Sequence, residues 1–386
     1  MKYRALGNTG LLVSEIGLGG EWLERHSSRE VRAVIDCCEE NGINVLDCWM
    51  SEPNVRSNIG AAIRGKRDRW IIEGHIGSTW QNGQYVRTRE MGKVREAFED
   101  LLTRLETDYI DLGMIHFVDE PAEFDRILAG EFMEYVRSLK KQGVIRHIGL
   151  STHNPAVAKQ AALCGEIELL LFSINPAFDL LPADEDMNRY FDEASYAGDF
   201  SGIAPERAEL YRICEQRGVG IHVMKGYAGG RLFSEKTSPF GVALTPVQCL
   251  HYALTRPAVA SVMAGFDTPE HVLEAVSYEN ATEQEKDYAS VLARAPRHAY
   301  SGQCTYCGHC APCPAGIDVA MVSKLYDLAV MQDTVPAAVQ AHYQALSAHA
   351  GDCIRCGGCE MRCPFHVPVM ERMDRIRKIF GEQRGD

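Results

Sequence analysis

Short apolar runs alternate with amphipathic segments along the chain up to about residue 296. Eight of these runs have the length and β-rich composition of buried strands. They lie at Glu15–Gly19, Asn44–Cys48, Trp70–Ile76, Ile110–His116, His147–Ser151, Leu169–Asn175, Gly220–Lys225 and Ser261–Gly265. Helical periodicity occupies the segments between them, at Ser28–Asn41, Met91–Leu105, Glu131–Gln142, Pro205–Arg217 and Thr245–Thr255. Alternating strands and helices favour parallel pairing with right-handed crossovers, so the pattern predicts an α/β fold that closes into a (β/α)8 TIM barrel.

Polar residues stand at the C-terminal ends of several predicted strands. In a (β/α)8 barrel the chemistry takes place at that face, where the loops between strands and helices begin. The residues at these ends are Asp47, His75, His116, Ser151, His153, Asn175 and Lys225. We expect a site there because these residues share one position, whereas a single histidine at a strand end is more often structural.

The chain after residue 303 contains eight cysteines in two runs. The runs are Cys304-x2-Cys307-x2-Cys310-x2-Cys313-Pro314 and Cys353-x2-Cys356-x2-Cys359-x3-Cys363-Pro364. This is the pattern of a two-cluster ferredoxin, in which three thiolates of a run hold one [4Fe-4S] cluster and the cysteine before proline ligates the other. The pattern predicts Cys304, Cys307, Cys310 and Cys363 on one cluster, and Cys353, Cys356, Cys359 and Cys313 on the second.

Two other uses of cysteine fit these runs less well. A disulfide framework suits a small secreted domain, and zinc usually takes four ligands in paired spacings. One irregularity concerns the first run, which closes with Ala311-Pro312 where three residues are usual. The remaining six cysteines lie in apolar helix or strand patterns and are expected to be buried free thiols; they are Cys37, Cys38, Cys48, Cys164, Cys214 and Cys249.

Charge and composition narrow the possible partners. The net charge is −13 without an interrupting basic stripe, which argues against nucleic acid and anionic membrane surfaces. Apolar residues make up 46% of the chain, enough for a full core, yet nowhere do roughly 18 of them run together as a membrane span requires. The first residues, Met1–Gly7, show no apolar stretch after their charges, so we expect a cytoplasmic protein.

Residues 1–280 resemble the aldo-keto reductases. The matching stretches are an opening hairpin at Lys2–Ser14 with the turn Gly7–Gly10, then Ile43–Asp47, Tyr109–Leu112, Ile148–Ser151 and Gly229–Leu232. The resemblance implies a barrel of aldo-keto reductase type over 1–280, followed by a connecting helix and linker over 281–303. A subgroup of that family carries two cysteine runs after the barrel. Because Val319–Ala348 has a helical pattern, we expect 304–386 to be an α-helical ferredoxin-like domain with two [4Fe-4S] clusters.

The catalytic pattern of the family is only partly present. Aldo-keto reductases are similar in using an Asp, Tyr, Lys and His tetrad, and the resemblance assigns two of these roles to Asp47 and His116. Alignment places Glu52 at the tyrosine position and His75 at the lysine position. The four residues Asp47, Glu52, His75 and His116 are therefore our predicted catalytic set. They can transfer protons near neutral pH or hold a divalent metal, and the alternative is a barrel that has lost its chemistry.

A nicotinamide site is also implied by the resemblance. The residues that match are Ser151 and Asn154 after the fifth strand, Met224 and Lys225 after the seventh, and Gly265 after the eighth. Gly265 precedes a helix whose N-terminus could face a phosphate. The acidic Asp267 and Glu270 in that loop favour NAD(H) over NADP(H), and the plain alternative is a helix N-cap.

The sequence thus predicts an oxidoreductase that acts on a small organic substrate and moves electrons through two clusters. Such clusters imply a ferredoxin-like partner or an electron-accepting cofactor, with a flavin as an alternative. Two other hypotheses stay open: an isomerase or lyase that uses His75 and His116 as acid and base beside structural clusters, and an electron-transfer subunit with a vestigial barrel. A long acidic segment at 176–202 is expected to be either a lid over the barrel mouth or a solvated face.

Overall fold

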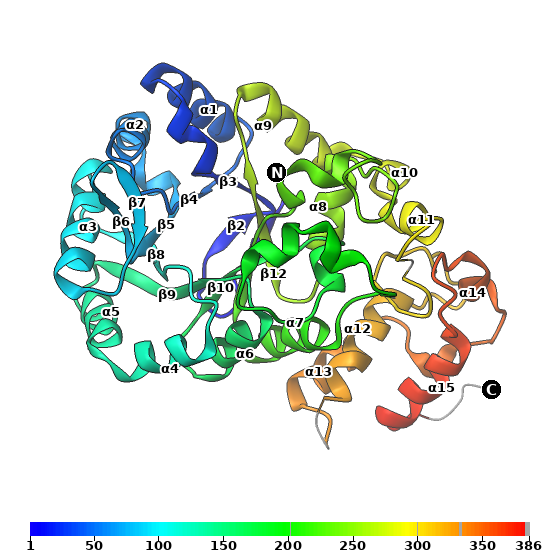
Figure 1. Cartoon of the computed structure of the whole chain (residues 1–386). Coiled ribbons are helices and arrows are strands. Elements are labelled where there is room, and N and C mark those ends of the chain that lie inside the picture. Colours follow the sequence, from blue (N-terminus) through cyan, green and yellow to red (C-terminus); the bar gives the residue numbers. More distant parts are fainter. Residues whose placement is uncertain (201, 299, 332–333, 383–386) are drawn as a thin grey trace.

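Eight parallel strands form a closed barrel in the computed structural model, which describes residues 1–200, 202–298, 300–331 and 334–382 (Figure 1). Around the barrel the strands follow the order β10-β11-β12-β3-β4-β5-β8-β9. Their bounds are β3 Ile16–Gly19, β4 Val45–Cys48, β5 Ile71–Ile76, β8 Ile110–Ile115, β9 Ile145–Thr152, β10 Leu169–Ser173, β11 Gly220–Met224 and β12 Val259–Gly265. The predicted α/β barrel is confirmed, with each strand within two residues of its expected position at either end.

Helices cover the outside of the barrel. They are α1 Ser28–Glu40, α2 Pro53–Ile63, α3 Met91–Arg104, α4 Pro121–Ala129, α5 Glu131–Lys141, α6 Pro155–Leu163, α7 Pro205–Arg217, α8 Pro246–Leu254 and α9 Pro269–Val276. Their starts follow local chemistry, since Ser27 with Glu30 and Thr245 with Gln248 form capping boxes. Several others begin with proline in the first turn, where its missing N–H costs nothing.

Two β-hairpins lie outside the barrel sheet. β1 Tyr3–Ala5 and β2 Leu12–Ser14 pair antiparallel, as expected from the sequence, and the chain around them buries Leu6 and Val13 against the lower core of the barrel. The second hairpin, β6 Ser78–Gln81 with β7 Gln84–Arg87, was not predicted. Its turn is Asn82-Gly83, with φ of 52° and 78°, the dipeptide that tight two-residue hairpins prefer.

The acidic segment after β10 is packed into the protein. It contains the short 3-10 helices η3 Phe178–Leu180, η4 Met187–Phe191 and η5 Glu193–Tyr196. Asp179 is fully buried and accepts hydrogen bonds from the hydroxyls of Tyr211 and Tyr252. The described part of this segment therefore packs into the main core, which a purely solvated face would not do; residue 201 lies outside the described residues.

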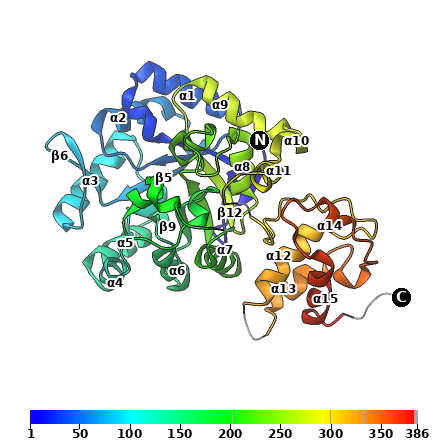
Figure 2. The same cartoon turned by 45° about the vertical axis from the view of Figure 1, so that its right-hand side comes forward.

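The C-terminal part is helical, as predicted. Its elements are α10 Glu283–Lys286, α11 Tyr288–Ala293, α12 Val319–Ala329, α13 Ala337–Gln344, α14 Gly358–Arg362 and α15 Val369–Ile379. In Figures 1 and 2 the helices α12 to α15, coloured orange to red, lie beside the barrel. The Gln216 side chain on α7 donates to the Leu328 carbonyl at 2.7 Å, and Lys324 pairs with Glu215 at 3.0 Å. Polar contacts therefore fix α12 against α7.

The remaining 3-10 helices are η1 Gly20–Arg25, η2 Arg67–Arg69, η6 Ala228–Phe233, η7 Ser277–Asn280 and η8 Ala350–Asp352. Within the described residues, no helix combines the length and apolar character needed to cross a membrane.

Candidate active site

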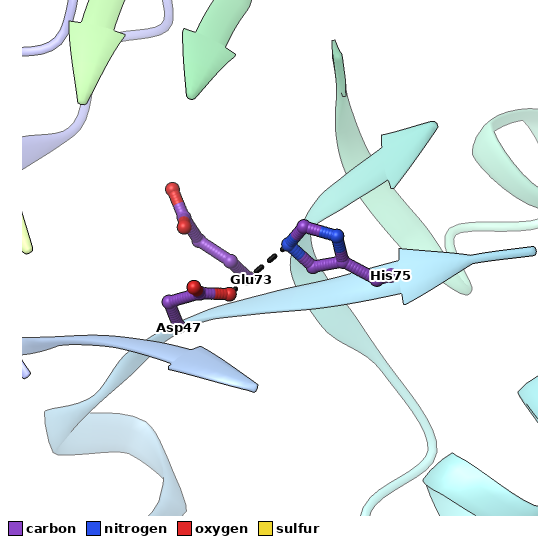
Figure 3. A group of neighbouring side chains, drawn as sticks. All are labelled: Asp47, Glu73 and His75. Carbon is purple, nitrogen blue, oxygen red and sulfur yellow. Dashed lines mark ion pairs between the residues drawn. The ribbon is translucent and has the colours of Figure 1, made fainter. Parts of the chain in front are cut away.

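Asp47 and His75 face each other inside the mouth of the barrel. Asp47 lies near the end of β4 and His75 near the end of the neighbouring β5, and both are almost completely buried. Asp47 Oδ1 lies 3.0 Å from His75 Nε2 (Figure 3, dashed line). The two atoms are close but not aligned as a hydrogen bond, because each remains without a hydrogen-bond partner among the described residues. Two residues of the predicted catalytic set are thus in contact.

His116 extends this contact toward the mouth. It follows β8, and its Nδ1 lies 2.7 Å from Nδ1 of His75. Its other ring nitrogen, Nε2, lies 2.7 Å from the hydroxyl of Tyr85 on β7. The Trp49 ring lies nearly parallel to the imidazole, with centroids 5.8 Å apart and an interplanar angle of 10°. Tyr85, His116 and His75 therefore form a hydrogen-bonded chain that ends beside Asp47.

The electrostatics of this chain favour neutral groups. Burial, followed by the nearby charges of His75 and Arg89, lowers the pKa of His116 well below its ordinary value. Burial likewise raises the pKa of Tyr85, so its hydroxyl keeps its proton near pH 7. A neutral imidazole has one N–H and one acceptor nitrogen, so the chain can pass a proton in either direction by exchanging tautomers.

Two further residues at this site were missed by sequence reasoning. Glu73 is fully buried on β5, and its Oε1 lies 2.5 Å from Nδ1 of His222 on β11 across the barrel. Burial, together with the neighbouring Asp47, raises the pKa of Glu73. The signal was present in the sequence, because Glu73 and His75 are alternate residues of one strand and must face the same side. Tyr85 was missed for a different reason: the Asn82-Gly83 turn, which predicts a hairpin here, was not recognised in the sequence.

Glu52 uses its carboxylate as a helix cap. It is the N-cap of α2, where its Oε2 accepts from the Val55 backbone N–H at 2.7 Å. Its Oε1 accepts from the Asn54 side chain at 2.9 Å. Both oxygens are therefore used at the start of the helix, which gives Glu52 a structural role beside the catalytic one expected from its position. Its role in turnover stays a prediction.

The residues expected to hold the nicotinamide amide already have partners. The Ser151 hydroxyl accepts from the Phe117 backbone N–H at 2.8 Å. The Asn154 amide caps α6 by accepting from Ala156 N–H at 2.8 Å, and it donates to the Asp119 carbonyl at 2.8 Å. Asn154 is thus fully engaged within the protein, while Ser151 retains its hydroxyl proton.

The rest of the expected dinucleotide site is covered by η1. A methyl group placed on Gly265 would approach the indole of Trp22 to 2.5 Å, so that ring fills the space above the end of β12. Lys225 pairs with Glu21 at 3.5 Å beside the half-buried Met224, and His26 pairs with Asp267 at 2.6 Å. Within the described residues these contacts do not form an open phosphate cradle.

The second cysteine run surrounds a cavity together with a residue of the first. Cys353, Cys356 and Cys359 line it, and Cys313 enters from the first run, as crossed ligation requires. Ile317, Val369 and Met373 supply apolar walls. The chemistry and arrangement of the four thiols fit a [4Fe-4S] cluster, although the ligation itself stays a prediction.

The first cysteine run contacts the end of the second run. Burial, followed by the neighbouring thiols of Cys304 and Cys307, raises the pKa of Cys310 to about 12. Arg362, the residue before Cys363, donates to the Cys310 and Pro312 carbonyls at 2.6 and 2.8 Å. The Arg362 side chain thus links the end of the second run to the first, and ligation of the first cluster by Cys363 stays a prediction.

Comparison with known families gives one match for the barrel and one for the cysteine-rich region. The model of the aldo/keto reductase family matches residues 15–247, which is more than half of the chain. The chain belongs to the aldo/keto reductase family. A 4Fe-4S dicluster domain matches residues 303–368 and includes all eight cysteines of the two runs.

The chain is similar to several bacterial proteins, which it matches over all or part of their length. An uncharacterized oxidoreductase YqkF of Bacillus subtilis is 29% identical over 74% of this chain and 94% of its own length. Aldo-keto reductase YhdN of the same species is 32% identical over 39% of this chain and 47% of its own. The solved aldo-keto reductase AKR11C1 of Bacillus halodurans aligns with a TM-score of 0.57 at 26% identity, covering 74% of this chain and 94% of its own. The chain is an oxidoreductase of aldo/keto reductase type with an added iron-sulfur domain.

Proposed function

We propose that the barrel interconverts a small alcohol and its carbonyl compound while the two clusters carry the electrons. Conversion of an alcohol to a carbonyl releases two electrons and two protons, and the reverse reaction takes them up. Two [4Fe-4S] clusters that each carry one electron match that count. The single observation that carries this proposal is the way in which the first cysteine run is bonded into the barrel.

That bonding passes through Thr305, which follows Cys304 directly. The Thr305 carbonyl accepts from the buried guanidinium of Arg256 and, at 3.1 Å, from the hydroxyl of Tyr288 on α11. A cluster held by Cys304 would therefore lie against the barrel wall, with bonded backbone and buried aromatic rings between the two.

Buried tyrosines continue the connection to the mouth. The ring of Tyr252 packs against that of Tyr288, and its hydroxyl lies 3.2 Å from that of Tyr300. The Tyr300 hydroxyl donates to the Pro176 carbonyl at 2.6 Å, a few residues beyond the end of β10. A packed path supports electron transfer between the cluster domain and the barrel mouth better than a flexible linker would.

The proton steps belong to the Tyr85–His116–His75 chain. Tyr85 lies at the outer end, so its hydroxyl can donate a proton to a substrate oxygen or accept one from it. The proton comes from or returns to solvent at the mouth, His116 exchanges it with the Tyr85 oxygen through Nε2, and His75 with Asp47 orients His116 from the inner side. This chain differs from the tetrad of the family, and we expect only weak reduction of generic aldehydes with NADH or NADPH.

A ferredoxin-like partner is proposed to dock at the second cluster. Cys356 is exposed there, and beside it Ile354 and Met361 are 64% and 83% exposed. Apolar side chains around a redox centre suit a transient protein contact, because they can be desolvated at little cost. A small acidic electron carrier would have to overcome the net charge of −13, so we expect its docking to strengthen at higher ionic strength.

An anaerobic redox experiment tests the function. The visible spectrum of the full chain is followed while candidate alcohols or carbonyl compounds are added to oxidised or reduced clusters. Clusters that change oxidation state in proportion to substrate support the proposal. Substrate conversion with unchanged clusters instead supports the isomerase or lyase, and no conversion of any candidate together with ordinary cluster reduction supports the electron-transfer subunit.

A further inference from the structure

Three buried ligand-type atoms converge beneath the mouth of the barrel. Asp47, Glu73 and His75 each offer one atom, and these atoms all lie within 4.8 Å of one another. Figure 3 shows the two carboxylates and the imidazole arranged around one space, from the neighbouring strands β4 and β5. Strand pairing fixes this arrangement, since Asp47 is directly opposite Glu73 in the β4–β5 register and His75 lies two residues further on the same face.

Each of the three residues also has a buried polar atom that lacks a hydrogen-bond partner among the described residues. Asp47 Oδ1, Glu73 Oε2 and His75 Nε2 are buried and lack a hydrogen-bond partner there. Buried polar atoms are normally hydrogen-bonded, so three neighbouring residues that each have an unpartnered buried atom require an explanation. The 3.0 Å contact between Asp47 Oδ1 and His75 Nε2 is informative, because the atoms lie side by side without hydrogen-bond alignment. Ligands of a common cation have this relationship, with bonds of about 2.1 Å and neighbouring donors roughly 3 Å apart.

We propose that Asp47, Glu73 and His75 bind a divalent cation. Two carboxylate oxygens and one imidazole nitrogen suit a metal of intermediate hardness such as Mn²⁺, Fe²⁺ or Zn²⁺. The charges agree as well, because both buried carboxylates have imidazoles as their ion-pair partners, His75 for Asp47 and His222 for Glu73. A divalent cation balances two carboxylates without requiring a proton on either histidine.

The surrounding side chains form the outer shell that such a site needs. His222 Nδ1 contacts Glu73 Oε1 at 2.5 Å, which leaves Glu73 Oε2 for the metal. His116 Nδ1 contacts His75 Nδ1 at 2.7 Å, which leaves His75 Nε2 for the metal. Outer contacts of this kind orient ligands and fix the tautomer of a ligating histidine.

The site would also set the direction of the proton chain, a consequence that rests on the proposed function. With Nε2 of His75 on the cation, its proton is on Nδ1 and is donated to His116 Nδ1. The His116 proton is then on Nε2 and is donated to the oxygen of Tyr85. The Tyr85 hydroxyl proton is thereby released from His116 and is free for a substrate oxygen.

Equilibrium dialysis of the full, cluster-loaded chain against Mn²⁺ tests the site. Mn²⁺ prefers oxygen and nitrogen ligands to thiolate, so it discriminates this site from the 14 cysteines, and elemental analysis separates it from cluster iron. We expect about one bound manganese per chain, with the visible spectrum of the clusters unchanged. Absence of bound Mn²⁺ and of Zn²⁺ bound outside the cysteines overturns the proposal.

Matched variants locate the ion. Glu73→Gln and Asp47→Asn should each weaken Mn²⁺ binding by at least about tenfold. Asp267→Asn is the control, because it removes a carboxylate that pairs with a histidine, His26, at the same face but outside the site. Should Glu73→Gln fail to fold, Asp47→Asn and the wild type still decide the matter. Equal binding by wild type and Asp47→Asn, or loss of binding in Asp267→Asn, places the ion elsewhere and overturns the proposal.

This experiment is independent of the reaction. If the protein binds manganese but no substrate changes the oxidation state of its clusters, the proposed function is refuted and the metal site stands. Cluster reduction by substrate in a protein that binds no cation would do the reverse.

Discussion

The Tyr85 hydroxyl lies 2.7 Å from Nε2 of His116, although the two residues come from different parts of the barrel rim. Tyr85 belongs to the β6–β7 hairpin, and His116 follows β8. The aldo/keto reductase resemblance places its tyrosine between Asp47 and Gly60, where this chain has none. The hairpin therefore supplies a phenol to the site from another loop.

Replacing this phenol tests its role. Tyr85→Phe removes the hydroxyl while keeping the ring, so turnover should fall by about 10²–10⁴-fold if the group is the general acid or base. Turnover and the cluster spectrum are measured together under anaerobic conditions. Tyr3→Phe is the matched control, since the Tyr3 hydroxyl contacts the Gly42 carbonyl on the far side of the barrel. Turnover close to wild type in Tyr85→Phe would remove the phenol from the mechanism.

The roles of Glu52 and of the two histidines can be distinguished by measuring both turnover and stability of their variants. His75→Ala and His116→Ala should each lower turnover by more than about tenfold, because each interrupts proton transfer. Glu52→Gln should also lower the free energy of unfolding by about 1 kcal/mol, since it weakens the N-cap of α2, and a loss of turnover in the folded variant would support the catalytic role expected from its sequence position. Steady-state kinetics and denaturant unfolding of the three variants distinguish the roles. Turnover near wild type in Glu52→Gln would leave Glu52 with its capping role alone.

Crossed ligation of the clusters gives a reciprocal prediction. Wild type should contain about eight iron atoms per chain, and either Cys313→Ser or Cys363→Ser should lose about half of them. Because Cys313 lines the cavity of the second run, Cys313→Ser should damage the cluster of Cys353, Cys356 and Cys359. Cys363→Ser should damage the other, and EPR spectra of the reduced proteins identify which cluster is retained. If each serine damages the cluster of its own run, the crossed assignment is wrong.

His251 predicts a specific loss of stability in acid. Burial, with the positive charges of Lys286 and Arg256, lowers the pKa of His251 to about 4. The unfolded chain binds this proton near pH 6.5 and the folded protein only near pH 4, so stability should fall as pH decreases between these values. Below pH 4 both states are protonated and this contribution stops changing.

The corresponding measurement compares thermal unfolding of wild type and His251→Gln across that range. The variant cannot titrate at position 251, so its stability should decline less steeply between pH 6.5 and 4. Acid damage to the clusters affects both proteins alike and cancels in the difference. Parallel pH profiles for the two proteins would show that His251 does not contribute.

The sequence alone determined the barrel, the two cysteine runs and part of the site. Strand positions follow from local apolar runs between amphipathic helices, and a closed barrel brings every strand end to one face. Asp47, His75 and His116 could thus be named in advance, because each lies at or next to a strand end and needs only the fold to meet the others. The cysteine spacing carried the cluster pattern in the same local way.

Only the tertiary structure decided which partners these residues have. Glu73 and His222 lie 149 residues apart in the chain, and their contact depends on the diameter of the barrel and on side-chain rotamers. Tyr85 reaches His116 only because the Asn82-Gly83 turn folds its strand back over the mouth. Trp22 of η1 packs over Gly265, and the Glu52 carboxylate caps α2. These choices are made by packing and hydrogen-bond competition across the whole domain, and a pattern of residue types along the chain does not contain them.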